Sequence, residues 1–488
     1  MPFPIEHRPR CNVLVVPGLV RGAEPGQENQ LPQQPVDLSS HLLRARTMKS
    51  LEGPNGTFEL VFTFAGLDTA SMPFGGVTID RRALSEVLVP ENMVQVAFDQ
   101  GIPGSEITTV MQGTITKVFA KTTIDASGRP RREIIVTGED WGKLLVEHDL
   151  PVHLFTTFIQ GGREPVERAL KKLSVIGAVG RVCEDLFTSV FRDQLGDIPT
   201  FTLGLRDLYA IDIEPELFDQ ARGYIYADGV WMRQGKFWNA LRGLADEPWN
   251  ELYADWDDLI RKFVIRLRRR PFEPDLWEAL PVRTVTDDEL LYVETTLTDH
   301  ERVNWVLVVP SGLIHSTTDQ SLDFLTFLVR RFDREDAEAH GARLLKRQSA
   351  FVDYPGGRNG ATLLNDPEEQ ARLAGGSGRV FTNLDRRVRQ LWDWFAINHR
   401  LRCGTWVCSG RPDIHIGERV ANQREPSASF VNTEDARRTY YVEKVIHDYV
   451  EGHHFFTHLA LTRGMPLDEF ILPAVDGLAG REVAATAS

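Results

Sequence analysis

Short stretches in which apolar and polar side chains alternate are the feature of this sequence that most limits its fold. Residues 57–64 place polar side chains, apart from Val61, on one face and four apolar ones on the other: Phe58, Leu60, Phe62 and Phe64. A period of two residues indicates a half-buried β-strand, because successive side chains of a strand point to opposite faces. Similar stretches cover 93–98, 108–119 and 131–137. Residues 50–140 are therefore predicted to form a compact antiparallel β domain.

The middle of the chain has a helical spacing instead. Successive separations of four, three, four and four residues draw one apolar stripe that Pro271 would end: Leu252, Trp256, Leu259, Phe263 and Leu267. Phe237, Leu241 and Leu244 repeat the pattern over a shorter segment, and Pro165 lies near the start of a third predicted helix. Residues 161–280 are thus predicted to be mainly helical.

A second β region opens at 290–309 and resumes from Gly404. Between these parts two helices are predicted, one over 322–332 and one over 384–399, from apolar residues three or four positions apart. The segments 440–450 and 453–462 are typical of a hairpin whose connection is Glu451 and Gly452.

Composition excludes several classes of protein. The chain has 488 residues, of which 42% are hydrophobic and 25% charged, so it has enough apolar material for two to four folded domains. Its 69 acidic and 55 basic residues give a net charge of -14, which disfavours broad binding to phosphate backbones or anionic membranes. No apolar run approaches the ~20 residues of a membrane-spanning helix. The N-terminal sequence MPFPIEHRPR lacks the layout of a secretory signal, so synthesis in the cytoplasm is expected.

The common catalytic motifs are missing from the sequence. It contains no P-loop, no G-x-G-x-x-G after a strand, no G-x-S-x-G, no H-E-x-x-H and no C-x-x-C. Its four cysteines are too few and too scattered for a disulfide framework, and a structural role is expected for each: Cys11, Cys183, Cys403 and Cys408.

Histidines in the predicted C-terminal hairpin are the one cluster with the composition of a metal site. If Glu451 and Gly452 form the loop, His447 lies opposite Phe456, and His454 and His458 share its face. Three imidazoles could then converge, as zinc requires. The other face is predicted to be buried, with Val442, Ile446, Val450, Phe455, Leu459 and Leu461. Solvated or interface histidines are the favoured interpretation, because a slip of one residue moves every side chain to the opposite face.

Charged pairs and runs have simpler interpretations as well. The pairs Asp257 with Asp258 and Asp287 with Asp288 could serve glycoside hydrolysis, but adjacent acids on helices or turns are usually solvated. The basic run 266–270 is interpreted as a charge match at a helix C-terminus rather than a nucleic-acid patch.

Three segments, 132–145, 404–420 and 440–464, resemble the baseplate hub proteins of tailed phages, the relatives of the late control D proteins found also in tailocins and contractile injection systems. In that family a strand ending in a G-x-D turn leads into a helix, and a late hairpin follows the pattern Y-x-V-x-x-V-x-H…T-x-L-x-L-x-R-G. The residues matching the hairpin pattern are Tyr440, Val442, Val445, His447, Thr457, Leu459, Leu461, Arg463 and Gly464. The stretches GTFELVFTF and VLVPENMVQVAFDQG fit the first hub domain.

The resemblance implies a structural protein of the virion tail baseplate, made in the host cytoplasm. Such a hub is a homotrimer in which two tube-like β-barrel domains per chain imitate a sixfold ring. It adapts the tail tube to the central spike and also contacts baseplate wedge or tape-measure proteins, while DNA only passes through its channel and no membrane is inserted. No enzyme activity, catalytic residue, cofactor or metal is expected. The alternatives are a virion-associated hydrolase of cell-wall or capsule glycans, with paired carboxylates on a β scaffold, and a histidine-bound metalloenzyme.

The predicted fold class is therefore α+β, predominantly antiparallel β, with two tail-tube-like β-barrel domains and mainly helical inserted modules. The expected division is an N-terminal strand and arm (1–40), a first barrel (41–160), a mainly helical middle domain (161–284), a second barrel (285–314 with 400–470), a helical or loop insertion (315–399) and a flexible tail (471–488). The two β regions should share one strand order. A different order, or one sheet around an enclosed pocket, would favour the glycan hydrolase.

Overall fold

The computed structural model of the chain describes residues 8–16, 35–63, 73–74, 77–78, 84–102, 104–124, 130–147, 209–213, 236–245, 247–271, 273–299, 301–310, 330–349, 385–423 and 438–466. Several predicted features lie outside these residues: the arm around 21–34, the helix near Pro165, most of the helix at 322–332, and the tail from 471.

The first β region forms an antiparallel unit. Its strands are β1 (Arg10–Val16), β2 (Val36–Asp37), β3 (Leu42–Ser50), β4 (Thr57–Thr63), β7 (Met93–Asp99), β8 (Thr108–Ile124) and β9 (Pro130–Asp140), in the sheet order β3-β4-β9-β8-β7-β1-β2. Alternation along β4 buries Phe58, Leu60 and Phe62 in its core, as predicted. Helices α1 (Leu84–Val87), α2 (Gly142–Glu147) and η1 (Ser39–His41) accompany this unit, as does the small β5–β6 pair (Pro73–Phe74 and Val77–Thr78).

The second β region forms another unit of mostly antiparallel strands. Its strands are β13 (Val282–Thr286), β14 (Leu290–Thr296), β18 (Arg402–Ser409), β19 (Arg419–Gln423), β20 (Arg438–Val450) and β21 (His454–Pro466). They follow the order β14-β18-β21-β20-β19-β13, in which only β13 and β19 run parallel. Trp406, Tyr440 and Leu459 lie in its core.

The two units share a strand order. Numbered along the chain within each unit, and leaving out β2, the strands of both lie in the order first, fourth, fifth, sixth, third, second. Irregularities of register match as well: β3 shifts between Leu42 and Arg44, and β14 shifts between Leu290 and Tyr292. The first and fourth strands are antiparallel in one unit and parallel in the other. The shared layout predicted for the two β regions is therefore confirmed at the level of strand order.

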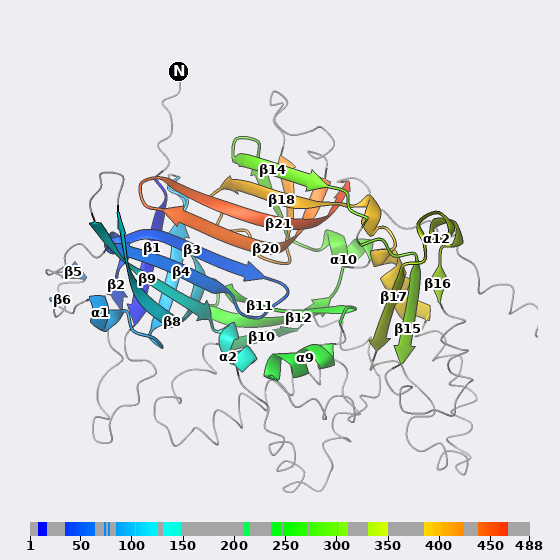
Figure 1. Ribbon diagram of the computed structural model, residues 1–488, viewed down its shortest axis with the longest axis horizontal. Helices are drawn as coiled ribbons and strands as arrows, with labels where there is room; N and C mark the ends of the chain where they lie inside the picture. The colour runs from blue at the N-terminus through cyan, green and yellow to red at the C-terminus, as the bar shows by residue number, and fades with distance from the viewer. Residues whose placement is uncertain are drawn as a thin grey trace, which may run out of the picture.

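The units are joined edge to edge within one 13-stranded sheet. The first half of β20 pairs with β19, while its second half, residues 444–450, pairs antiparallel with β3 of the first unit. Figure 1 shows this junction where β3, in blue, lies beside β20, in orange, and the whole sheet curls around it. The fold is thus predominantly antiparallel β, as predicted, and the two β regions are continuous rather than separate.

The predicted helix at 252–267 is wrong. These residues form the hairpin of β11 (Asn250–Asp257) and β12 (Lys262–Arg269), which β10 (Tyr209–Ile213) extends. Leu252 lies opposite Leu267 and Trp256 opposite Phe263, so residues expected on one helix face meet across two strands. Leu259, at the tip, is 96% exposed, whereas a helix stripe would bury it. The described part of the predicted helical middle domain therefore consists largely of strands, with helices only at α9 (Phe237–Ala245) and α10 (Pro274–Glu278).

A separate group of strands and helices packs around a core that is rich in tryptophan. Strand β15 (Trp305–Pro310) pairs with β16 (Arg331–Phe332) and in parallel with β17 (Leu344–Ser349), so it lies in a separate sheet rather than in the second β unit, where we predicted it. The predicted helix at 384–399 is confirmed over residues 385–395. Helix α12 (Arg334–His340) and the turn η4 (Asn398–Arg400) complete this group, whose core includes Trp249, Trp277, Val306, Leu391 and Trp394.

Candidate functional site

The histidines that were predicted to share one face of the C-terminal hairpin lie on opposite faces in the observed register. The loop contains Glu451, Gly452 and His453, one residue more than predicted, and Gly452 has a φ of 69°. His447 consequently lies opposite Thr457 instead of Phe456, and His458 lies opposite Ile446. The prediction of a shared histidine face is wrong, because one extra loop residue moves the facing strand by one side chain.

The hairpin buries the predicted face only in part: Val442, Phe455, Leu459 and Leu461 are buried as predicted. Val445, His447, Tyr449, Phe455 and Thr457 are buried. Ile446 and Val450, which we expected inside, are only half-buried on the other face with His454 and His458. In the second half of β20, His447 and Tyr449 therefore take the place of Ile446 and Val450 in this core.

His447 is held neutral between the two β units. Its Nδ1 lies 3.1 Å from Oγ1 of Thr457, and its ring lies 5.6 Å from that of Phe98, in the first unit. Burial, together with the nearby His415, lowers the pKa of His447 to about 3. A neutral imidazole with a hydroxyl partner satisfies a buried polar position without a buried charge.

The outer face of the hairpin carries His454 and His458. The ring of His454 stacks on Phe456 at a centroid distance of 4.3 Å, and partial burial lowers the pKa of His458. In the described part of the chain no three His, Cys, Asp or Glu side chains are placed to hold a metal ion.

The last two residues of the family's hairpin pattern, Arg463 and Gly464, anchor β21 to its neighbours. The Cα of Gly464 lies against the ring of Tyr440, where an added Cβ would be 2.4 Å from the Cε1 atom of that ring. Arg463 has a φ of 54°, and its guanidinium lies 3.5 Å from the ring centroid of Trp394. Its Nη1 donates to the Trp394 carbonyl (2.7 Å) and to Oδ1 of Asn398 (2.8 Å). These side chains attach the hairpin to the helix at 385–395.

The G-x-D turn has a comparable role in the first unit. Oδ1 of Asp140 accepts a hydrogen bond of 2.9 Å from the amide of Gly142, where α2 begins. Its other oxygen pairs with Lys49, whose ammonium also donates to the Pro54 carbonyl (2.9 Å) and lies 4.7 Å from the ring centroid of Phe263. Burial raises the pKa of Asp140 despite this cation. The turn therefore ties β9 to β3 and to the β11–β12 hairpin.

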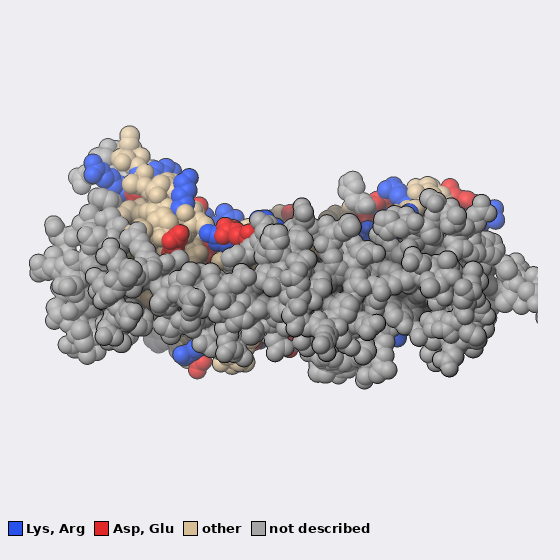
Figure 2. Space-filling view, turned by 90° about the horizontal axis from the view of Figure 1, so that it is seen from below, with Lys and Arg blue, Asp and Glu red and all other residues tan. Residues whose placement is uncertain are grey.

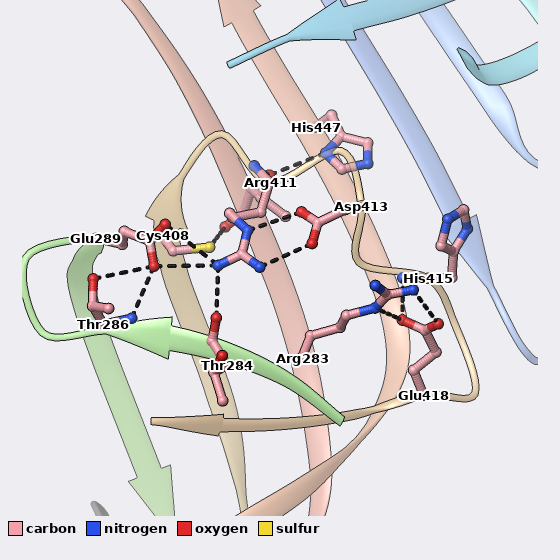
Figure 3. A network of polar contacts seen from close by, with 11 residues as sticks. Arg283, Thr284, Thr286, Glu289, Cys408, Arg411, Asp413, His415, Glu418 and His447 are labelled. Atoms are coloured by element: carbon pink, nitrogen blue, oxygen red, sulfur yellow. Dashed lines mark hydrogen bonds and ion pairs between the residues drawn. The ribbon is translucent and has the colours of Figure 1, made fainter. Parts of the chain in front are cut away.

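A second polar network fills the loop between β18 and β19 (Figure 3). Arg411 binds Asp413 through two hydrogen bonds, of 2.8 and 2.9 Å, and donates 2.7 Å to the carbonyl of Thr284 and 3.2 Å to Glu289. Arg283 of β13 makes two bonds of 2.9 Å with Glu418. These contacts join the loop to β13 and to the turn before β14.

His415 links the same loop to the β11–β12 hairpin. Its Nδ1 lies 3.1 Å from Oδ2 of Asp255. Burial lowers the pKa of His415, but the Asp255 carboxylate outweighs burial and raises it above the usual value. The neighbouring cavity, lined by Lys49, Met111, His415 and His447 among others, has a volume of about 20 Å³. That volume holds about one water molecule, so the continuous sheet does not enclose a substrate-sized pocket at this position.

The acidic pairs and the arginine run stabilise turns and strands. Asp257 accepts from the amide of Leu259 (3.1 Å) and from Arg266 (2.6 Å), and Asp287 accepts from Asn422 (2.8 Å). Arg268 and Arg270 both bind Glu251 of the facing strand, at 3.1 and 3.0 Å. The run thus lies on strand β12, so the interpretation as a helix C-terminus is wrong.

The cysteines in the described residues are free: Cys11, Cys403 and Cys408. Cys183 lies outside the described residues. Cys11 and Cys408 are buried and Cys403 is half-buried, as a packing role requires. None of the described helices combines the length and apolarity needed to span a bilayer.

Each of these clusters holds strands together, and sequence reasoning missed most of their members. Glu251, Asp255, Arg411 and His415 belong to no short catalytic motif. One local signal was available, since Arg411 and Asp413 flank Pro412 in a segment that resembles the hub family. The partners of Glu251 and Asp255 could not be predicted, because this region was expected to form a helix rather than a pair of facing strands.

No protein-family model and no curated protein matches the sequence. Among solved structures, the chain is similar to the tail protein from Neisseria meningitidis MC58, with 12% identity, a TM-score of 0.47, and 94% of this chain and 97% of that one covered. It is also similar to the 43 kDa tail protein of prophage MuSo2 from Shewanella oneidensis (11% identity, TM-score 0.45, 94% and 99% covered). The E. coli c3393 protein, described as a component of the type VI secretion system, has 9% identity and a TM-score of 0.37 over 89% of this chain and 77% of that one.

Proposed function

We propose that this chain is a structural hub subunit at the tip of a phage tail or a related injection system. Three copies form a ring that adapts the sixfold tail tube to a threefold central spike and continues the channel through which DNA passes. The ring is made in the host cytoplasm and becomes part of the tail baseplate. Its neighbours are the tube, the spike, and wedge or tape-measure proteins.

The strand order shared by the two β units is the observation that carries this proposal. One building block occurs twice in the chain, with its first copy docked on the second through β3 and β20. Three chains therefore supply six similar blocks, which is the number needed to match a sixfold tube while keeping threefold symmetry.

Charge and burial are compatible with this role. A net charge of -14 limits the adhesion of DNA to a channel wall. The residues of the hairpin pattern lie on β20 and β21 of the second unit, and this hairpin also contacts the first unit, since His447 of β20 packs on Phe98 of β7. In this proposal their function is to hold the two units in a fixed relation, and no catalytic step is assigned to them.

Native mass measurement and electron microscopy test the proposal. The expected species is a trimer of 55.1 kDa chains, alone or with the spike. Particle images should show a ring of six similar lobes with threefold symmetry. A chain that stays monomeric at micromolar concentration with its spike present would contradict the proposal.

A further inference from the structure

Half of strand β8 lacks a strand on one of its edges. Residues 108–114 pair with β7 and then, after a register shift at Thr116, residues 117–124 pair with β9. Among the described residues, no strand pairs with the other edge of 117–124. Figure 1 shows this end of the β8–β9 hairpin projecting beyond the rest of the sheet.

The equivalent edge in the second unit is occupied. There β20 pairs with β19 up to Tyr441, its register shifts at Glu443, and β3 pairs with residues 444–450. Matching the two shifts aligns Lys117 with Lys444 and Lys121 with Asp448. The second half of β8 is therefore the counterpart of the surface on which β3 docks within the chain.

The equivalent of β3 is β14, which stands at the end of the sheet order. It pairs with β18, and no second strand pairs with it in the described part of the chain. The matching register shifts align Leu42 with Leu290, and hence Arg46 with Glu294. Among the described residues, each chain thus has one strand of the docking type and one receiving edge without a second strand beside it.

Exposed apolar side chains mark both of these edges. Phe119 is 38% and Ile124 is 77% exposed on β8, while Leu291 (47%), Tyr292 (50%) and Leu297 (57%) are exposed on or directly after β14. At the occupied junction the counterpart of Phe119 is Ile446, which is half-buried. Long exposed apolar edges are sites for pairing with another chain.

Charges on the two edges are opposite. Lys117 and Lys121 are exposed on β8, and Glu294 is exposed on β14. Figure 2 shows blue Lys and Arg side chains on the projecting part at the left, the end of the molecule that holds β8 and β9. The occupied junction has such an ion pair across it, between Arg44 and Asp448 at 3.0 Å.

We propose that β14 of one copy pairs antiparallel with residues 117–124 of the next copy, as β3 pairs with β20 within the chain. The inference rests on the proposed function, since it identifies the partner as a second copy of this chain and gives the register of the joint. Transfer of the β3–β20 register places Lys121 opposite Glu294 of the partner subunit and Ala120 opposite Thr295 of the partner subunit. The contact is head-to-tail, so it forms a ring only if the rotation closes.

Charge exchange tests the register. Lys121→Glu places two acids opposite each other at every joint and should weaken association about tenfold over the ring, because directly opposed like charges destabilise a strand pair. Glu294→Lys should have the same effect, and the double variant should restore association. Lys346→Glu, the same change on exposed β17, is the matched control. Equal association of all four variants would overturn the proposed joint.

Disulfide cross-linking provides a second, independent measurement. Ala120→Cys combined with Thr295→Cys should give covalently linked chains on oxidation. Lys121→Cys combined with Thr295→Cys should not, since residue 121 points to the opposite face. An oligomer without the 120–295 cross-link would overturn the joint and leave the trimeric ring standing. A chain that remains monomeric and unlinked at high concentration would overturn both.

Discussion

Buried polar side chains such as His447 have hydrogen-bond partners on other strands, so the pKa of such a side chain depends on the fold. His447 binds a proton in the unfolded chain below about pH 6.5 but in the folded chain only below about pH 3. Between these values the unfolded state binds more protons, so the free energy of unfolding decreases as the pH falls through this window.

His447→Gln tests this linkage. At pH 5 the wild-type chain should have lost about 2 kcal/mol of stability through this group relative to pH 7, since each pKa unit corresponds to about 1.4 kcal/mol. The variant lacks the titrating ring, so its unfolding free energy should decrease less between pH 7 and pH 5. Denaturant unfolding at both pH values measures the difference. Parallel pH profiles for the two proteins would exclude a neutral, buried His447.

Gly464→Ala tests the close packing at the end of β21. The added Cβ would lie 2.4 Å from the Tyr440 ring, so the strand or the ring must shift. The expected loss is about 1–3 kcal/mol of stability, the usual range for overpacking. Gly53→Ala is the control, because its nearest neighbour is the Asn55 side chain at 3.3 Å. Thermal unfolding compares them, and an unchanged Gly464→Ala midpoint would contradict this packing.

At the scale of elements, the buried carboxylate of Glu251 attaches the β11–β12 hairpin to the second unit, in addition to the contact of Asp255 with His415. Glu251 binds Arg268 and Arg270 and also accepts 2.6 Å from the Tyr441 hydroxyl of β20. Burial raises the pKa of Glu251, but the two guanidinium groups outweigh burial and hold it below its usual value.

Glu251→Gln should therefore cost on the order of 3 kcal/mol, because it leaves two half-buried cations without their buried counter-charge. Asp258→Asn, in the turn of the same hairpin, should change stability by less than about 0.5 kcal/mol. Chemical denaturation measures both. A Glu251→Gln variant as stable as the control would show that this carboxylate does not hold the hairpin.

The elements differ in how far their sequence predicts them. Strands β4, β7, β8 and β9 follow from alternation, because each buries one face. The 252–267 pattern fits a helix and a hairpin equally well, since pairs such as Trp256 and Phe263 lie seven residues apart and also face each other across a turn. The histidine face depended on one loop residue, which periodicity does not determine.

At the scale of the whole molecule, the described buried charges serve packing, and the proposal assigns no turnover to the chain. Purified protein incubated with peptidoglycan or capsule should release no soluble glycan above a buffer control. The physical reason is that the acids considered for catalysis, such as Asp257 and Asp287, already accept hydrogen bonds from the chain itself. Release that disappears in an Asp257→Asn or Asp287→Asn variant would instead favour the glycan hydrolase.

The covalent link between the two units has a consequence for the order and speed of assembly. The β3–β20 junction forms within one chain, so its two surfaces meet at a high effective concentration that does not depend on protein dilution. In a ring of such chains every second joint is complete before any two molecules collide. Only the remaining joints carry the translational entropy cost of association. In the proposed ring, the presence of two units in one chain thus halves the number of joints that must form between molecules, and it lets alternate joints differ in sequence.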